Sequence, residues 1–347
     1  MTPRYNPDVN GYWMCDIGRF GYHWVESETR VRRPMVRRGG ALEAVAWHDA
    51  EPKVRDGLSS AGAADAASVR FLASAHASVE DFFVLKQLVT GLLGEDGHKA
   101  VTVAWTRSVK PQPAGTKFRV PVTDAPNVAA AHDLGFQVGA GNDGEPDLVS
   151  LRTAVEGNRV KALYVIDPGP AGSLGNLSWL LDARRAGRVP FLVVQSATMT
   201  DLASEADVVL PGLTSLERDA IYTNDTGRLQ AAAAAIPAPG DAREDWQILA
   251  SLGTALGLSL PYSTSADVRA AIAAAMAGTL YAAADQLVFA RPMAARSWLQ
   301  ASNPSERWKW DFMFQDLPPV KGHNVQLEGL AREGAGPNYI PLRQVDK

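Results

Sequence analysis

The spacing of apolar residues between residues 68 and 210 predicts strands that alternate with helices. Short apolar runs at 69–75 and 160–166 are typical of buried strands. After Ser78, which forms a weak capping box with Asp81, apolar residues recur at helical spacing. This alternation predicts an α/β protein with a doubly wound parallel sheet and right-handed crossovers. The expected elements are, in chain order, strand 69–75, helix 78–93, strand 101–105, helix 148–155, strand 160–166, helix 177–186, strand 191–194 and strand 206–210.

A glycine-bearing loop, Asp167–Gly175, directly follows the third of these strands. Such a loop could cradle a phosphate at the start of the helix near Leu177, because the first N–H groups of a helix are free. However, Pro168 and Pro170 have no backbone N–H, so two donors that a phosphate cradle would use are missing from the loop. The loop also matches neither G-x-G-x-x-G nor a P-loop. We therefore expect a structural turn that binds no nucleotide with a Kd stronger than ~1 mM.

The stretch Ala206–Gln230, ADVVLPGLTSLERDAIYTNDTGRLQ, combines two short β-prone runs with a cluster of charges. The first run ends at a Pro-Gly turn, and the second, at 221–223, ends at the turn signal Asn224–Gly227. Glu217 and Asp219 lie between the runs, on either side of an arginine. We interpret these two carboxylates as salt-bridged loop charges rather than as an acid–base pair.

This stretch resembles the molybdopterin oxidoreductase superfamily, in which a strand ending in ADVVLP precedes an acidic residue and a Y-T-N…GR-Q segment. It is most similar to the G-subunit family of bacterial NADH–quinone oxidoreductase (respiratory complex I), which keeps the fold without molybdenum chemistry. The resemblance covers roughly residues 3–257. It implies two doubly wound, Rossmann-like parallel-sheet lobes and an irregular C-terminal tail. The expected divisions are 1–40, an incomplete end of a [4Fe–4S] module; 41–147, the first lobe; 148–260, the second lobe with a returning segment; and 261–347, a helix and extended tail.

Cys15 is the one cysteine of the chain. It lies in N-P-D-V-N-G-Y-W-M-C-D-I-G-R, which resembles the end of the family's iron–sulfur module, where a C-x-x-C-x-x-x-C group and a fourth cysteine hold a [4Fe–4S] cluster. Cys15 matches the fourth cysteine, and the first three have no counterpart. The resemblance implies that Cys15 is a cluster ligand in a longer or complemented chain. In the chain as given, we expect a lone buried thiol and no redox centre.

We assign no catalytic or cofactor-binding residue from the sequence. Ser-His-Asp spacing, H-E-x-x-H and a cysteine cluster are all absent from it. His76 follows the strand at 69–75, where ligand sites of α/β proteins often lie, but we interpret it as a hydrogen-bonded loop histidine. Catalytic members of the superfamily place a cysteine, selenocysteine or serine on the metal, so Ser74 stays open as a serine ligand.

Arginines cluster ahead of the first predicted strand. We interpret them as a solvated face or as salt-bridge partners of a neighbouring domain, and an anion site is the less favoured alternative. They are Arg30, Arg32, Arg33, Arg37 and Arg38.

Composition excludes several functional classes. The chain is 46% hydrophobic with a net charge of −4, which argues against binding to nucleic acid or to an anionic membrane. The sequence has no apolar run of the ~18–20 residues that a spanning helix needs, and its start lacks the layout of a signal peptide. We expect a cytoplasmic protein without direct membrane insertion, held at the inner face of the plasma membrane through partner subunits.

The aromatic residues of the tail alternate along the chain, as in an extended segment. They form either an edge strand that packs on the chain itself or an arm that a neighbouring subunit completes, and we favour the arm. They are Trp308, Trp310, Phe312 and Phe314.

Three functions are consistent with these observations. The first is a mainly structural subunit of a respiratory NADH–quinone oxidoreductase peripheral arm, which supports electron transfer from NADH to quinone alongside other subunits. The second is a fragment of a catalytic molybdopterin-dependent oxidoreductase that binds a pterin nucleotide. The third is an interaction module that reuses the fold. Molybdenum is expected only under the second.

Overall fold

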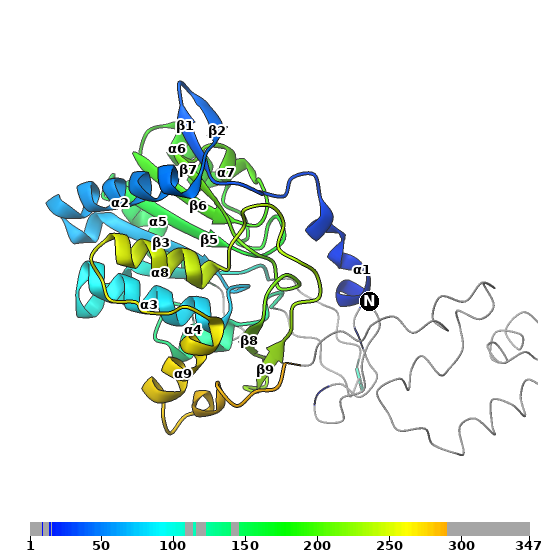
Figure 1. Cartoon of the computed structure of the whole chain (residues 1–347). Helices are drawn as coiled ribbons and strands as arrows, with labels where there is room; N and C mark the ends of the chain where they lie inside the picture. The colour runs from blue at the N-terminus through cyan, green and yellow to red at the C-terminus, as the bar shows by residue number, and fades with distance from the viewer. Residues whose placement is uncertain are drawn as a thin grey trace, which may run out of the picture. The chain divides into compact units, whose positions relative to one another are not determined.

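A seven-stranded sheet organises the larger of the two units into which the chain divides, residues 25–292 (Figure 1). The computed structural model describes residues 9, 14, 16–107, 114–115, 123–139 and 146–289. In the other unit, 1–24 with 293–347, the described residues form α1 (Asp16–Phe20) and the start of the 3-10 helix η1 (Gly21–Glu26). Cys15 and the aromatic tail residues Trp308–Phe314 lie outside the described residues, so the predictions about them stay predictions.

The strand order of the sheet is β2-β1-β7-β6-β5-β3-β4. Neighbours from β7 to β4 pair in parallel, whereas β1 pairs antiparallel with both β2 and β7. The α/β class with a parallel, doubly wound sheet is therefore confirmed. The strands are β1 (Met35–Arg38), β2 (Ala41–Ala44), β3 (Val69–Ser74), β4 (Val101–Ala104), β5 (Ala162–Asp167), β6 (Phe191–Ser196) and β7 (Val208–Pro211).

Helices cover both faces of this sheet, which explains why its central strands are apolar on both sides. Successive residues of β5 show the two faces: Tyr164 packs in one hydrophobic cluster and Val165 in the other. The first face is covered by α2 (Trp47–Ala64), α3 (Val79–Leu93), α4 (Val128–Asp133), α8 (Asp245–Ala255) and α9 (Ser265–Ala275). The second is covered by α5 (Leu148–Glu156), α6 (Ser178–Arg185) and α7 (Asp201–Ser204).

A separate two-stranded sheet carries the end of the ADVVLP…GRLQ stretch. It pairs β8 (Ala220–Thr223) antiparallel with β9 (Leu229–Ala232), and we call it the β8–β9 hairpin. Short 3-10 helices complete the described structure: η2 (Ala66–Ser68), η3 (Glu95–Ala100) and η4 (Leu280–Ala283). None of the helices in the described ranges combines the length and the apolar character needed to cross a bilayer.

The strands expected in two lobes are joined in one sheet. β3 pairs in parallel with β5, in a register from Val69↔Ala162 to Ala73↔Ile166. Both strands are apolar on both faces, so pairing them side by side buries both. The chain winds from β3 to β4 in one direction and from β5 through β6 to β7 in the other. The carboxyl ends of β3 and β5 therefore form the switch point, where α/β sheets bind their ligands. The domain divisions given above stay predictions.

Candidate functional site

Three buried polar side chains meet at the switch point. Ser74 ends β3 and Asp167 ends β5, while Ser173 reaches them from the glycine-bearing loop. The Ser74 hydroxyl donates to Ser173 Oγ at 3.2 Å, and the Ser173 hydroxyl donates to Asp167 Oδ1. The exposed fractions are 0% for Ser74, 2% for Ser173 and 5% for Asp167. These groups therefore hold one another rather than facing solvent.

The carboxyl group of Asp167 binds a proton more tightly than an ordinary aspartate. Burial raises the pKa of Asp167 to about 7, against the opposing effect of the hydrogen bonds from Ser173 and from the Gly169 N–H. Asp167 is therefore partly protonated at neutral pH. A buried carboxyl of this kind is often part of a functional site, although purely structural networks also produce it.

The glycine-bearing loop is tightly packed against its surroundings at Gly169. A Cβ atom at this position would lie 2.6 Å from Ser173 Cβ and 2.9 Å from His76 Cγ. A side chain would therefore force the loop away from the ends of β3 and β5. This packing agrees with the prediction that the loop is a structural turn. That the loop binds no nucleotide tightly stays a prediction.

His76 lies beside this loop. Its Nε2 is 3.2 Å from the carbonyl oxygen of Asp124, and because a carbonyl only accepts, Nε2 carries the hydrogen. Burial lowers the pKa of His76 to about 4, so the ring is neutral at physiological pH. The interpretation of His76 as a hydrogen-bonded loop histidine is confirmed.

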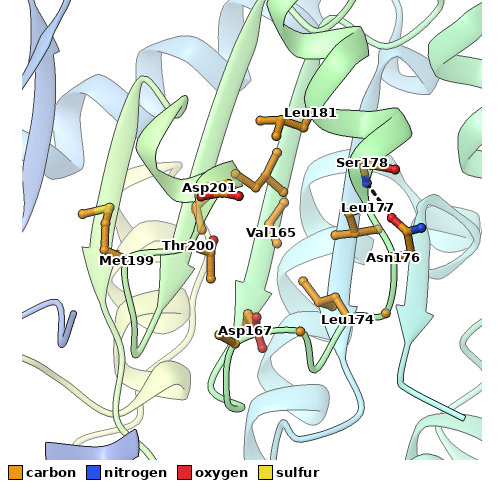
Figure 2. A pocket seen from close by; sticks show the side chains of 15 residues that line it. Val165, Asp167, Leu174, Asn176, Leu177, Ser178, Leu181, Met199, Thr200 and Asp201 are labelled. Atoms are coloured by element: carbon orange, nitrogen blue, oxygen red, sulfur yellow. Dashed lines mark hydrogen bonds between the residues drawn. The ribbon is translucent and has the colours of Figure 1, made fainter. Parts of the chain in front are cut away.

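A cavity of about 460 Å³ opens next to these residues, between the starts of α6 and α7. Figure 2 shows the apolar side chains of Leu174 and Leu177 together with the polar side chains of Asn176, Thr200 and Asp201 around it. Two of the polar groups already accept hydrogen bonds from backbone N–H groups at the starts of the helices. Asn176 Oδ1 accepts the Ser178 N–H at 3.0 Å, and Thr200 Oγ1 accepts the N–H of Ala203 at 3.2 Å.

The charge of the cavity decides which ligands it can hold. Asp167 and Asp201 are the ionisable groups among its described lining residues, and no lysine, arginine or histidine joins them. A phosphate would therefore meet carboxyl groups rather than cations.

A second set of functional candidates lies in the ADVVLP…GRLQ stretch, where Glu217 and Arg218 are buried in ion pairs. Arg30 donates to both carboxylate oxygens of Glu217, at 2.9 and 2.7 Å, which confirms Glu217 as a salt-bridged loop charge. Arg30, which belongs to the arginine cluster at 30–38, is therefore buried rather than solvated. Asp219 accepts the N–H of Ala234 at 2.8 Å.

Arg218 is the residue that sequence reasoning missed. It is 1% exposed, and its Nη1 donates to Asp81 Oδ2 at 2.7 Å and to Asp245 Oδ2 at 2.8 Å. The sequence signal for these ion pairs was the presence of acidic residues, Asp81 and Asp245, at the starts of α3 and α8. They were not recognised as partners because Asp81 is 137 residues away from Arg218.

Comparisons with known proteins find similarity over parts of this chain. The model of the family "Molybdopterin oxidoreductase" matches residues 103–255. A putative formate dehydrogenase of Bacillus subtilis (strain 168) is 34% identical over 128 residues, which are 36% of this chain and 13% of that protein. The NADH-ubiquinone oxidoreductase 75 kDa subunit of Reclinomonas americana is 42% identical over 78 residues, 22% of this chain and 11% of that protein.

Among solved structures, acetylene hydratase from Pelobacter acetylenicus aligns with a TM-score of 0.47 at 11% identity, covering 76% of this chain and 66% of that one. By contrast, the chain covers only a small part of the length of the putative formate dehydrogenase, 13%, and of the 75 kDa subunit, 11%. Residues 103–255 of this chain are thus similar to the molybdopterin oxidoreductase family.

Proposed function

We propose that the chain is a structural part of the peripheral arm of a respiratory NADH–quinone oxidoreductase and carries no molybdenum chemistry of its own. The observation that carries the proposal is the closure of the switch point. Ser74, Ser173 and Asp167 hydrogen-bond to one another and are almost inaccessible to solvent. A serine held in this way is poorly placed to serve as a metal ligand.

The donor set of the cavity also supports the proposal. The family name implies a molybdopterin, and a pterin nucleotide would bring a diphosphate to the carboxyl edge of the sheet. The neighbouring cavity offers Asp167 and Asp201 but no cationic side chain among its described lining residues. Pro168 and Pro170, at the start of the loop, have no N–H to donate. These residues do not fit a tightly bound diphosphate.

For iron–sulfur chemistry, the chain would supply at most one ligand. Within the described ranges, no group of three or more His, Cys, Asp or Glu residues could hold a metal ion. Cys15, which lies outside those ranges, is the one cysteine against the four thiolates that a [4Fe–4S] cluster normally needs. We propose that it binds a cluster only in a longer or complemented chain.

Other subunits of the assembly would then supply the flavin, the remaining clusters and the attachment to the inner face of the membrane. Support for this partner class comes from the 42% identity with a protein named as an NADH-ubiquinone oxidoreductase subunit. Nucleic acid is not expected as a partner, given the net charge of −4.

Affinity purification of the tagged full-length chain from its native host tests the proposal. The eluate is expected to oxidise NADH with a quinone acceptor, and an untagged strain serves as the control for background activity. A chain recovered without NADH–quinone reductase activity or associated subunits contradicts the proposal.

A second function is favoured by the 34% identity with a putative formate dehydrogenase. On that alternative, the chain belongs to a catalytic molybdopterin oxidoreductase, and Ser74 would need to leave its hydrogen bond with Ser173 to reach a metal. Reduction of a viologen dye by formate in the same eluate, in the absence of NADH, would favour this alternative.

A further inference from the structure

The first turn of α3 holds other elements of the fold through a buried glutamate. Glu80 is 1% exposed. Its Oε2 accepts the N–H of Ile221 in β8 at 3.0 Å, and its Oε1 accepts Nη1 of Arg269 in α9 at 3.2 Å. The carboxyl group of Glu80 therefore joins α3 to the β8–β9 hairpin and to α9.

The next residue joins α3 to two further segments. Asp81 Oδ1 accepts the N–H of Trp246 in α8 at 2.9 Å, and Oδ2 accepts Nη1 of Arg218 at 2.7 Å. Arg218 also binds Asp245, whose Oδ1 accepts Nε2 of Gln195 at 2.6 Å. The first turn of α3 is thus hydrogen-bonded to the segment before β8 and to the start of α8. Asp245 links the start of α8 to the end of β6.

The charges of this cluster do not balance. Three buried carboxyl groups, those of Glu80, Asp81 and Asp245, face two guanidinium groups, those of Arg218 and Arg269, and the partly buried Glu244 lies beside them. If all three buried carboxyls were ionised, an excess of one negative charge would be buried, which is costly in a medium of low dielectric constant. The other titratable groups around the cluster are Tyr164, Tyr222, Asp219, Glu51 and the Arg30–Glu217 pair.

We propose that this cluster, which we call the α3 latch, retains a proton at neutral pH and that losing this proton loosens the β8–β9 hairpin from α3. The geometry provides the mechanism. Opening the hairpin would let water reach Glu80 and the carboxyls beside it, which relieves the excess negative charge. Opening is therefore easier once the proton has left.

The direction of the pH dependence follows from burial. Burial raises the pKa of Glu80 and of Asp245 to about 7, and the neighbouring Asp81 carboxylate acts in the same direction. A carboxyl group with a raised pKa contributes stability that is complete below its unfolded pKa. This stability is lost as the pH rises through the folded value of about 7. The latch is closed in mild acid and weakened in mild base.

Hydrogen exchange of the full-length chain measures the opening directly. The readout is the protection factor of peptides covering 220–232, corrected for the intrinsic rate and compared between about pH 6 and about pH 8.5. For one proton with a folded pKa of about 7, protection is expected to fall about tenfold across this interval.

Two variants make the test specific. Glu80→Gln is an uncharged match to the protonated glutamate and should flatten the pH dependence. Glu156→Gln, which removes the exposed ion pair with Arg152, should behave as wild type. Wild-type protection that does not change with pH, or an undiminished fall in Glu80→Gln, overturns the proposal.

Infrared spectroscopy of the wild-type protein and of Glu80→Gln provides a second readout, because their difference removes the contribution of Asp167, whose pKa burial also raises to about 7. A protonated carboxylic acid has a carbonyl stretch distinct from the carboxylate bands, and it should disappear with a midpoint near pH 7. If this stretch is absent at about pH 6, the cluster holds no proton and the proposal is wrong.

Discussion

Removing the Arg218 side chain charge is expected to destabilise the fold strongly at neutral to alkaline pH. The substitution Arg218→Met keeps much of the apolar length but leaves Asp81 and Asp245 without their shared cation. These aspartates are 1% and 0% exposed, so water cannot replace the guanidinium group. Breaking a buried ion pair by removing one partner costs about 3–5 kcal/mol. That loss is a large part of the ~5–15 kcal/mol that stabilises a typical domain.

Urea unfolding followed by tryptophan fluorescence measures this loss. Trp246 is buried, and its backbone N–H donates to Asp81 Oδ1. We expect about 4 kcal/mol at about pH 8. The loss should be smaller at about pH 5.5, because burial raises the pKa of Asp245 to about 7 and its protonated form needs no cation.

Arg152→Met is the matched control, because Arg152 forms an exposed pair with Glu156 and should cost less than about 1 kcal/mol. A loss for Arg218→Met that is no larger than the control value at about pH 8 would refute this reasoning.

Three further perturbations follow from the packing and charge of the described residues. Gly169→Ala places a Cβ 2.6 Å from Ser173 Cβ, so thermal unfolding should show a loss of about 1–3 kcal/mol, and an unchanged Tm contradicts the packing. Gly97→Ala places a Cβ 2.1 Å from the carbonyl oxygen of Val89, a backbone atom that cannot rotate away, and we expect a Tm below that of Gly169→Ala. Burial lowers the pKa of His76 to about 4, so the contribution of His76 to stability should fall as the pH drops from about 6.5 towards 4, and the stability difference between wild type and His76→Gln in urea titrations should change by that amount over this interval.

Local signals predicted much of the fold. The apolar run at 69–75 became β3 at Val69–Ser74, because a run that is buried on both faces has few alternatives to a central strand. Ser78 and Asp81 form the expected capping box, since both of its bonds are local.

The rest depended on contacts between distant residues. The arginine-rich segment before α2 was interpreted through its charge, yet it forms the antiparallel β1–β2 hairpin, and Arg37 Nε donates to the carbonyl of Ala206 at 2.9 Å. The pairing of β3 with β5 was hidden because apolar strands carry no mark of their neighbour in the sheet. Similarly, the charges at 217–219 gave no indication that Arg218 would reach Asp81 at the start of α3.

The most direct test of the proposed function is the molybdenum and tungsten content of the chain, purified in its native assembly and measured by plasma mass spectrometry against protein concentration. Because the buried Ser74–Ser173–Asp167 group and the acidic cavity do not suit a metal-bearing pterin nucleotide, we predict amounts far below one atom per chain. A value of about one atom of either metal per chain would contradict the structural-subunit account and favour a catalytic molybdopterin oxidoreductase.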